Sequence, residues 1–256
     1  MSALKIGVTL WSLHGRTLDE ALEDVLELEL KGIQTWNIGG PLDPDNLTDE
    51  ARRQFLNRVT NMGLTITGLC AQLEGFHKPD GLRERIEKTK RVMELSVDWG
   101  VGITTAHIGP IPEDSSDPLW SQMARCMDEL GKYGERIGAV FACETGQESP
   151  ECLRQFLEHI GSTALKVNYD PANLNAGGFD PVAGVRVLKE YIVHTHVKDS
   201  KRGIGEVPVG QGEVPWREYI SALSEVGYDG WYAIERERGE NRKADIAAAK
   251  ALLEQL

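Results

Sequence analysis

The chain is poor in cysteine, and the few cysteines it has are scattered. Cys70, Cys126, Cys143 and Cys152 are the four cysteines among 256 residues, and no Cys-x-x-Cys spacing joins any two of them. Neither a disulfide framework nor a cysteine-bound zinc site is therefore expected.

Basic charge and long hydrophobic runs are also lacking. The 28 Lys and Arg residues face 40 Asp and Glu residues, so the formal net charge is −12. Without a basic stripe, the chain is not expected to bind nucleic acid. No apolar stretch approaches the ~20 residues that a membrane-spanning helix needs, and the opening MSALKIGVTLW does not resemble a secretory signal. We therefore expect a cytoplasmic protein that associates with neither nucleic acid nor membrane.

What the chain does have is a regular alternation of short apolar runs and longer amphipathic segments. The short runs are rich in β-branched and aromatic residues and are bounded by turn residues, which is typical of buried parallel strands. The longer segments carry helix signals, such as the capping box that begins at Thr17 and the apolar spacing within residues 83–99 and 216–226. The eight predicted strands are residues 5–11, 32–38, 64–70, 102–108, 139–144, 164–170, 192–198 and 230–235.

Eight strands alternating with about eight helices predict an α/β fold with a parallel sheet. Eight such units in about 250 residues are typical of a closed (β/α)8 TIM barrel. An open doubly wound sheet is the alternative, but WSLHGR follows the first strand in place of a Gly-x-Gly-x-x-Gly turn. No linker interrupts the pattern, so we predict one TIM-barrel domain over residues 1–256.

Ionisable residues stand at the ends of four consecutive predicted strands. These are Glu144, Asp170, His196 and Glu235, and period-two alternation turns them inward while their apolar neighbours face the helices. Active sites of TIM barrels lie at this end of the strands. Three carboxylates in one cavity repel unless they are protonated or neutralised by a cation. We therefore predict one divalent metal at these four residues; the donor set suits Mn²⁺ first, and also Mg²⁺, Co²⁺ or Zn²⁺.

Each of these residues has a plainer reading when taken alone, because a glutamate at a strand end commonly caps a helix or forms a loop salt bridge. His194 is predicted to be a hydrogen-bonded core residue one layer deeper. His107 faces the same mouth and is predicted to contact substrate, with a second metal or simple packing as alternatives. Lys198 is predicted to contact a substrate oxygen at the rim, the alternative being a solvated charge. Asp199 is open between supporting the site and capping a helix.

At these residues the sequence resembles the xylose isomerase-like barrel superfamily. This superfamily comprises sugar (phosphate) isomerases and epimerases and also DNA-repair enzymes of the endonuclease IV type. The resemblance covers nearly the whole chain, and it implies one divalent metal held by the same four residues, with Glu144 and Glu235 as paired acid and base. It rests on the motifs ACETGQESPE (142–151), VNYDPANL (167–174), HTHVKD (194–199), VGQGEVPW (209–216) and GYDGWYAIE (227–235).

One departure from the superfamily pattern concerns Asn173. Many members carry a histidine three residues after the aspartate of the sixth strand, where this chain has Asn173. An amide can bond a sugar hydroxyl but is a poor metal ligand, so a trinuclear zinc site is not expected. Gln147 and Glu148 stand where relatives contact substrate hydroxyls. The predicted substrate contacts are thus His107, Gln147, Asn173 and Lys198.

The resemblance and the metal site together indicate a metal-dependent isomerase or epimerase of a small sugar or ketose. A metal chelated by a ketose carbonyl and the adjacent hydroxyl would stabilise an enediolate while a carboxylate moves the proton. The same chemistry with loss of a hydroxyl would make the protein a lyase, such as a dehydratase of a keto-inositol or keto-sugar. A non-catalytic sugar-binding protein is a further alternative, and a nuclease would need more histidines and a basic groove.

Three features stay open from the sequence. The loop 199–215 is long enough to be a lid, and its Lys201 and Arg202 are either solvated or available to a phosphate. Phosphorylation of the sugar is therefore undecided. Barrels of this kind often associate, which leaves a homo-oligomer open.

Overall fold

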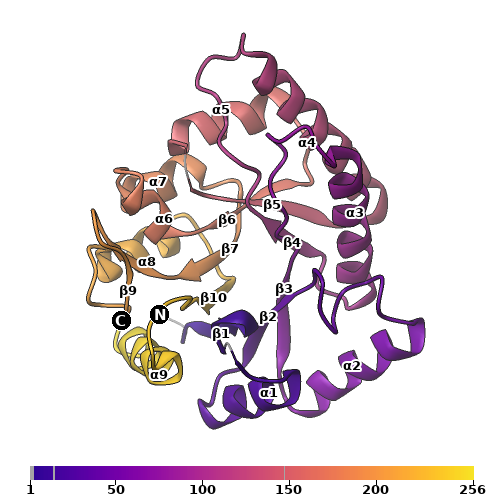
Figure 1. Cartoon of the computed structure of the whole chain (residues 1–256). Helices are drawn as coiled ribbons and strands as arrows, with labels where there is room; N and C mark the ends of the chain where they lie inside the picture. The colour runs from indigo at the N-terminus through magenta and orange to yellow at the C-terminus, as the bar shows by residue number, and fades with distance from the viewer. Residues whose placement is uncertain (1–2, 14, 147) are drawn as a thin grey trace.

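A closed barrel of parallel strands forms the centre of the molecule (Figure 1). In the computed structural model, residues 3–13, 15–146 and 148–256 are described. The barrel closes where β1 pairs with the last strand, β10, and the order around it is β1-β10-β7-β6-β5-β4-β3-β2. The predicted α/β TIM barrel is confirmed. The barrel strands are β1 (Lys5–Thr9), β2 (Gly32–Trp36), β3 (Thr65–Cys70), β4 (Ile103–Ala106), β5 (Val140–Glu144), β6 (Leu165–Tyr169), β7 (Ile192–Val197) and β10 (Trp231–Ile234).

Helices surround the barrel on the outside (Figure 1). The predicted capping box is present, since Thr17 and Glu20 bond each other's backbone at the start of the first helix. Within the described ranges, no helix is both long and apolar enough to cross a membrane. The helices are α1 (Leu18–Glu27), α2 (Asp49–Asn61), α3 (Leu82–Asp98), α4 (Pro118–Ile137), α5 (Pro150–Ile160), α6 (Pro171–Ala176), α7 (Pro181–Leu188), α8 (Trp216–Glu225) and α9 (Arg242–Leu253).

Two segments differ from the sequence prediction. The first strand ends at Thr9 rather than at residue 11, because the short 3-10 helix η1 (Leu10–Leu13) follows it. The segment 199–215, expected as a loop, contains a small antiparallel hairpin of β8 (Asp199–Lys201) and β9 (Gly205–Val207).

Asp199 organises the chain that follows this hairpin. Its carboxylate accepts hydrogen bonds from the backbone N–H groups of Gly210, Gly212 and Val214 and from the indole of Trp216. Asp199 does not cap a helix as one alternative had it, since among the described residues no side chain caps the next helix, α8. The carboxylate instead stabilises the turn between β9 and α8, whose three N–H groups donate to it rather than to a neighbouring strand.

The inside of the barrel is polar below its carboxyl end. Gln34, Thr67, Thr105, Asn168 and His194 are all buried there. The His194 ring lies between Asn168 Oδ1, 2.8 Å from Nδ1, and Thr67 Oγ1, 3.1 Å from Nε2. Burial lowers the pKa of His194 to about 3, so the ring is neutral at pH 7. His194 is thus the hydrogen-bonded core residue that the sequence predicted.

Candidate metal centre

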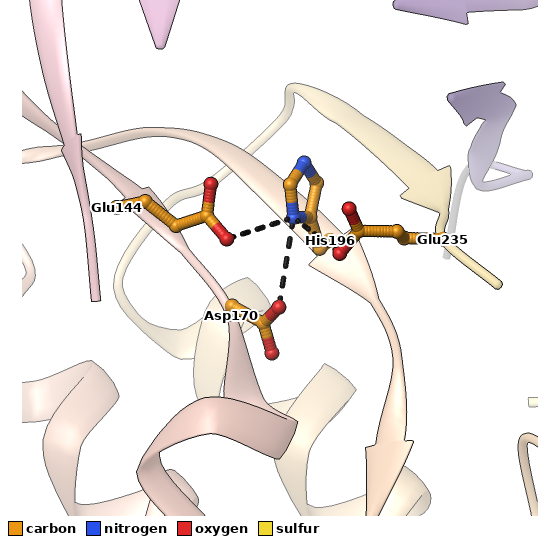
Figure 2. Close-up of side chains that lie close together, drawn as sticks. All are labelled: Glu144, Asp170, His196 and Glu235. Carbon is orange, nitrogen blue, oxygen red and sulfur yellow. Dashed lines mark ion pairs between the residues drawn. The ribbon is translucent and has the colours of Figure 1, made fainter. Parts of the chain in front are cut away.

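Four ionisable side chains meet at the carboxyl end of the barrel (Figure 2). One ligand atom from each lies within 4.8 Å of the others, and all four residues are buried. They come from the ends of four neighbouring strands: Glu144 from β5, Asp170 after β6, His196 from β7 and Glu235 after β10. The barrel brings them together because parallel strands end at one rim.

The atoms that face one another in this cluster are of the kinds that bind a cation. His196 Nδ1 lies 3.2 Å from Glu235 Oε2, 3.6 Å from Glu144 Oε1 and 3.6 Å from Asp170 Oδ2. Among the described residues, neither His196 Nδ1 nor Asp170 Oδ2 has a hydrogen-bond partner. Buried polar atoms are rarely left unpaired, and a donor set of three carboxylates with one imidazole suits a divalent ion. The buried cluster can therefore hold a metal.

Asp170 is held in place by the start of α6. Its Oδ1 accepts the backbone N–H groups of Ala172, 2.8 Å away, and Asn173, 3.0 Å away. Pro171 occupies the first position of this helix, where its missing N–H costs nothing. One carboxylate oxygen caps the helix, so the other is left facing the cluster.

His196 is held from the opposite side by the polar layer inside the barrel. Its Nε2 lies 2.9 Å from Oε1 of Gln34, and the amide nitrogen of Gln34 donates to Thr105 Oγ1 at 2.8 Å. The charges of Glu235 and Glu144 outweigh burial and hold the pKa of His196 well above its usual value. The proton on Nε2 is donated to Gln34, and a metal that displaced the proton on Nδ1 would find the lone pair of Nδ1 among the carboxylates. Asn168 lies beside both groups, 3.2 Å from His196 Nε2 and 3.3 Å from Glu144 Oε2.

The two glutamates are ionised at neutral pH. Burial alone would raise the pKa of Glu144, but the charges of His107 and His196 outweigh it and lower that pKa well below its usual value. Burial likewise opposes the charge of Glu235, yet His196 and Lys198 lower its pKa to about 2. The cations around the carboxylates therefore keep both as bases.

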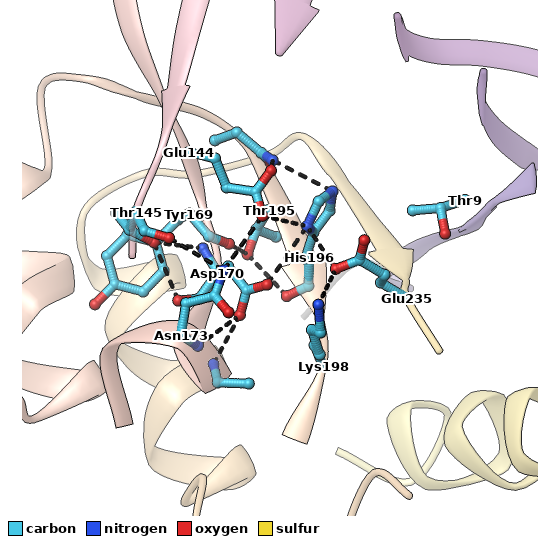
Figure 3. Close-up of polar contacts among 12 residues, drawn as sticks. Thr9, Glu144, Thr145, Tyr169, Asp170, Asn173, Thr195, His196, Lys198 and Glu235 are labelled. Carbon is cyan, nitrogen blue, oxygen red and sulfur yellow. Dashed lines mark hydrogen bonds and ion pairs between the residues drawn. The ribbon is translucent and has the colours of Figure 1, made fainter. Parts of the chain in front are cut away.

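Two of the predicted substrate contacts, Asn173 and Lys198, lie beside these glutamates in Figure 3. His107 Nε2 is 3.2 Å from Glu144 Oε1. The Asn173 amide donates to Glu144 Oε1 at 3.3 Å and to the carbonyl of Thr145 at 3.2 Å. Lys198 donates to Glu235 at 2.9 Å and to Glu237 at 2.6 Å. Gln147, the fourth predicted contact, lies outside the described residues.

A cavity of about 790 Å³ opens beside the cluster. The loops after β3, β4 and β5 and the helix α6 enclose it, and His107, Glu144 and Asn173 are among its lining residues. Its volume is in the range of small-molecule sites. Glu144 thus belongs to both the cluster and the cavity.

The sequence also matches known proteins. The pattern of the family described as xylose isomerase-like TIM barrel matches residues 22–256. The chain belongs to this family. L-ribulose-5-phosphate 3-epimerase UlaE of Escherichia coli (strain K12 / DH10B) is 36% identical over 218 residues, which cover 80% of this chain and 77% of that protein.

Two further relatives are matched over less of their length. Inosose dehydratase of Clostridium tetani is 25% identical over 146 residues, which cover 48% of this chain and 49% of that enzyme. An uncharacterised protein of Methanocaldococcus jannaschii is 26% identical over 177 residues, covering 61% of this chain and 60% of that protein. The chain therefore spans about half to three fifths of these two relatives.

A solved structure matches nearly the whole chain. The xylose isomerase domain protein of Planctomyces limnophilus superposes with a TM-score of 0.86 at 26% identity, covering 98% of this chain and 95% of that one. The relatives of this chain therefore include a named sugar epimerase and a named dehydratase.

One residue of the site, and one contact, escaped the sequence prediction. Gln34 was not singled out, although a glutamine within the apolar run GIQTWNI is a signal of an inward polar position. Trp11 lies just after β1, and its indole N–H donates to Glu235 Oε1 at 2.8 Å. Strands β1 and β2 contribute no carboxylate or histidine to the cluster, which is why a search for ionisable strand ends passed over Gln34 and the contact between Trp11 and Glu235.

Proposed function

We propose that this chain is a divalent-metal-dependent isomerase or epimerase of a small ketose. The observation that carries the proposal is the cluster of four buried ligand atoms in which Nδ1 of His196 and Oδ2 of Asp170 have no hydrogen-bond partner among the described residues. The epimerase and dehydratase relatives agree with chemistry next to a carbonyl.

We propose that Glu144, Asp170, His196 and Glu235 hold one metal ion, with Mn²⁺ as the preferred ion and Mg²⁺, Co²⁺ or Zn²⁺ as alternatives. An ion there would polarise the ketose carbonyl and stabilise the negative charge that develops on the enediolate. Three oxygen donors and one nitrogen donor favour hard or borderline ions over soft ones.

Two carboxylates of the chain, those of Glu144 and Glu235, would transfer the proton of the substrate. Figure 2 shows Glu144 and Glu235 on opposite sides of His196, so the two carboxylates would flank a substrate bound between them. One of them, ionised, would take the proton from the carbon next to the carbonyl, and the other would first take up a proton from the solvent and then return it to the opposite face. This exchange inverts the carbon; a proton returned to the neighbouring carbon gives the isomer instead.

Four residues are proposed to position the substrate: His107, Gln147, Asn173 and Lys198. His107 and Asn173 line the cavity beside Glu144, and both direct a ring or amide nitrogen at that carboxylate. Lys198 supplies an ammonium beside Glu235. These donors suit the hydroxyl and carbonyl oxygens of a sugar.

A lyase is the second candidate, because a β-hydroxyl that leaves from the same enediolate gives dehydration. The match to inosose dehydratase favours this alternative. Candidate ketoses incubated in D₂O separate the two reactions: carbon-bound deuterium without loss of water supports the isomerase or epimerase, and loss of water supports the lyase.

The first test is metal content. We expect about one equivalent of Mn²⁺ by mass spectrometry after loading, and a sharp loss in Asp170→Asn. This variant keeps Oδ1 to cap α6 and replaces only Oδ2, whereas Asp170→Ala would remove the cap as well. A matched control is Asp180→Asn, because Asp180 caps α7 through the same two-bond pattern. Equal metal in all three proteins, or none in the parent after loading, would refute the metal site.

A further inference from the structure

The cavity beside the metal cluster has an unusual charge distribution. Its ionisable lining residues are three glutamates, Glu74, Glu144 and Glu148, and two histidines, His77 and His107. None of the described residues that line it is a lysine or an arginine. Glu148 is only 8% exposed, so its carboxylate is part of the wall rather than a solvated surface group.

We infer that this cavity receives the part of the ketose that lies beyond the metal, and that it selects an uncharged polyhydroxyl chain over a phosphorylated one. This inference rests on the proposed function and adds the substrate class to it. L-ribulose-5-phosphate 3-epimerase UlaE, named above, acts on a sugar phosphate by its name, so this chain is expected to differ from it in substrate.

The polar groups of the wall are complementary to hydroxyl groups. A carboxylate of this wall accepts the hydrogen of a hydroxyl, and the ring of His77 can donate to its oxygen. A phosphate monoester carries about −1.5 to −2 charges at pH 7 and has strong acceptors only. Apart from the ring of His77 and that of His107, which is already paired with Glu144, it would face carboxylates with which it can form no hydrogen bond and which repel it.

Buried cations near the mouth of the barrel are already paired with carboxylates. Lys198 lies between Glu235 and Glu237. Arg236, the residue after Glu235, donates to Glu206 of the hairpin at 2.6 Å and to Asp245 of α9 at 2.8 Å. A phosphate that recruited either cation would have to compete with the carboxylates that it already pairs with, of which the side chains of Glu235 and Glu206 are buried.

Arg202, in the hairpin turn, is the rival source of a phosphate contact. It is exposed, and its Nε donates to the backbone carbonyl of Asn175, at the end of α6. Since Arg202 is not one of the lining residues of the cavity, a phosphate bound there would lie outside the acidic wall. The test must therefore separate the two positions.

The test compares ketopentoses and ketohexoses with their terminal phosphate esters on the Mn²⁺-loaded protein. Deuterium exchange gives kcat/KM for each form, and calorimetry gives binding whether or not a sugar is turned over. We expect at least a tenfold preference for the free sugar in both measurements. Inorganic phosphate at millimolar concentration should not compete with the free sugar.

Two variants locate the origin of this preference. Glu148→Gln removes one charge from the wall and should shift the ratio toward the phosphate ester at least threefold, whereas Glu29→Gln, at an exposed position remote from the barrel mouth, should leave it unchanged. Tighter binding or faster exchange of the ester would overturn the inference while the proposed function stands. Loss of that ester preference in Arg202→Gln would then place the phosphate at the hairpin. Binding of neither form would overturn both the inference and the proposed function.

Discussion

The hydrogen bond between Gln34 and His196 offers a sharp test of how the barrel prepares its metal site. Gln34 has no exposed surface, and its Oε1 lies 2.9 Å from His196 Nε2. If this bond keeps the proton on Nε2, then Gln34→Leu should weaken the metal site without removing any ligand. Leucine has a similar size but can neither accept from His196 nor donate to Thr105.

The expected size follows from what the change leaves behind. Loss of an outer hydrogen-bond partner of a metal ligand typically costs about 10- to 100-fold in metal affinity, which corresponds to about 1.4–2.8 kcal/mol. The N–H of His196 and the hydroxyl of Thr105 are also left without their glutamine partner inside the barrel, and each such loss costs about 1–3 kcal/mol of stability. We therefore expect both a higher Kd for Mn²⁺ and a lower melting temperature.

Calorimetric titration with Mn²⁺ measures the Kd, and ¹⁵N NMR of labelled histidine reports which ring nitrogen of His196 carries the proton. Gln34→Glu restores an acceptor and should recover most of the affinity. Thr67→Val is the matched control, because it removes a hydrogen bond in the same layer from His194 rather than from His196. A folded Gln34→Leu protein with the parental Kd and the parental tautomer would refute the reasoning.

Three further predictions concern the rest of the barrel. Gly32→Ala should destabilise the protein by about 1–3 kcal/mol in urea unfolding, because its Cβ would lie 2.5 Å from the ring of Trp231. Asp43 is buried, which by itself raises its pKa, but hydrogen bonds from Lys88 and two backbone N–H groups lower that pKa below the usual value. The ionised carboxylate of Asp43 therefore stabilises the fold above the ordinary aspartate pKa, and this stabilisation is lost as the pH falls through the lowered value. Between pH 7 and pH 3, Asp43→Asn should accordingly lose less of its resistance to urea than the parent does. Cys152 should react first when the native protein is treated briefly with a thiol reagent and its peptides are weighed, because the other three cysteines are buried.

Each of these predictions has a result that would contradict it. Gly40→Ala is the control for Gly32→Ala, since a Cβ at Gly40 would meet nothing within 4 Å; equal effects of the two would show that crowding is not the cause. Parallel stability curves for the parent and Asp43→Asn would remove Asp43 from the acid response. Early labelling of Cys143, which is 0% exposed, would mean that strand β5 opens more readily than its packing suggests.

The barrel could be predicted from the sequence because the signals for each strand and helix lie within that element or next to it. Alternating apolar runs and capped amphipathic segments specify strand, helix and their order, and the eightfold repetition leaves few ways to bury them. The capping box at Thr17 is local in the same sense, since both partners lie within four residues. The hairpin in residues 199–215 escaped prediction because its strands have three residues each, which is too short for a period to be recognised.

For the site, the sequence supplied the residue types and their faces, while the tertiary structure decided their mutual geometry. The alternation of inward and outward side chains was enough to nominate Glu144, Asp170, His196 and Glu235, because every parallel strand ends at the same rim. It could not reveal that Gln34, 162 residues from His196, holds that ring from below, or that Trp11 reaches Glu235 from across the closure between β1 and β10. Such contacts depend on which strands become neighbours when the barrel closes and on the free space inside it, and a period in the sequence encodes neither.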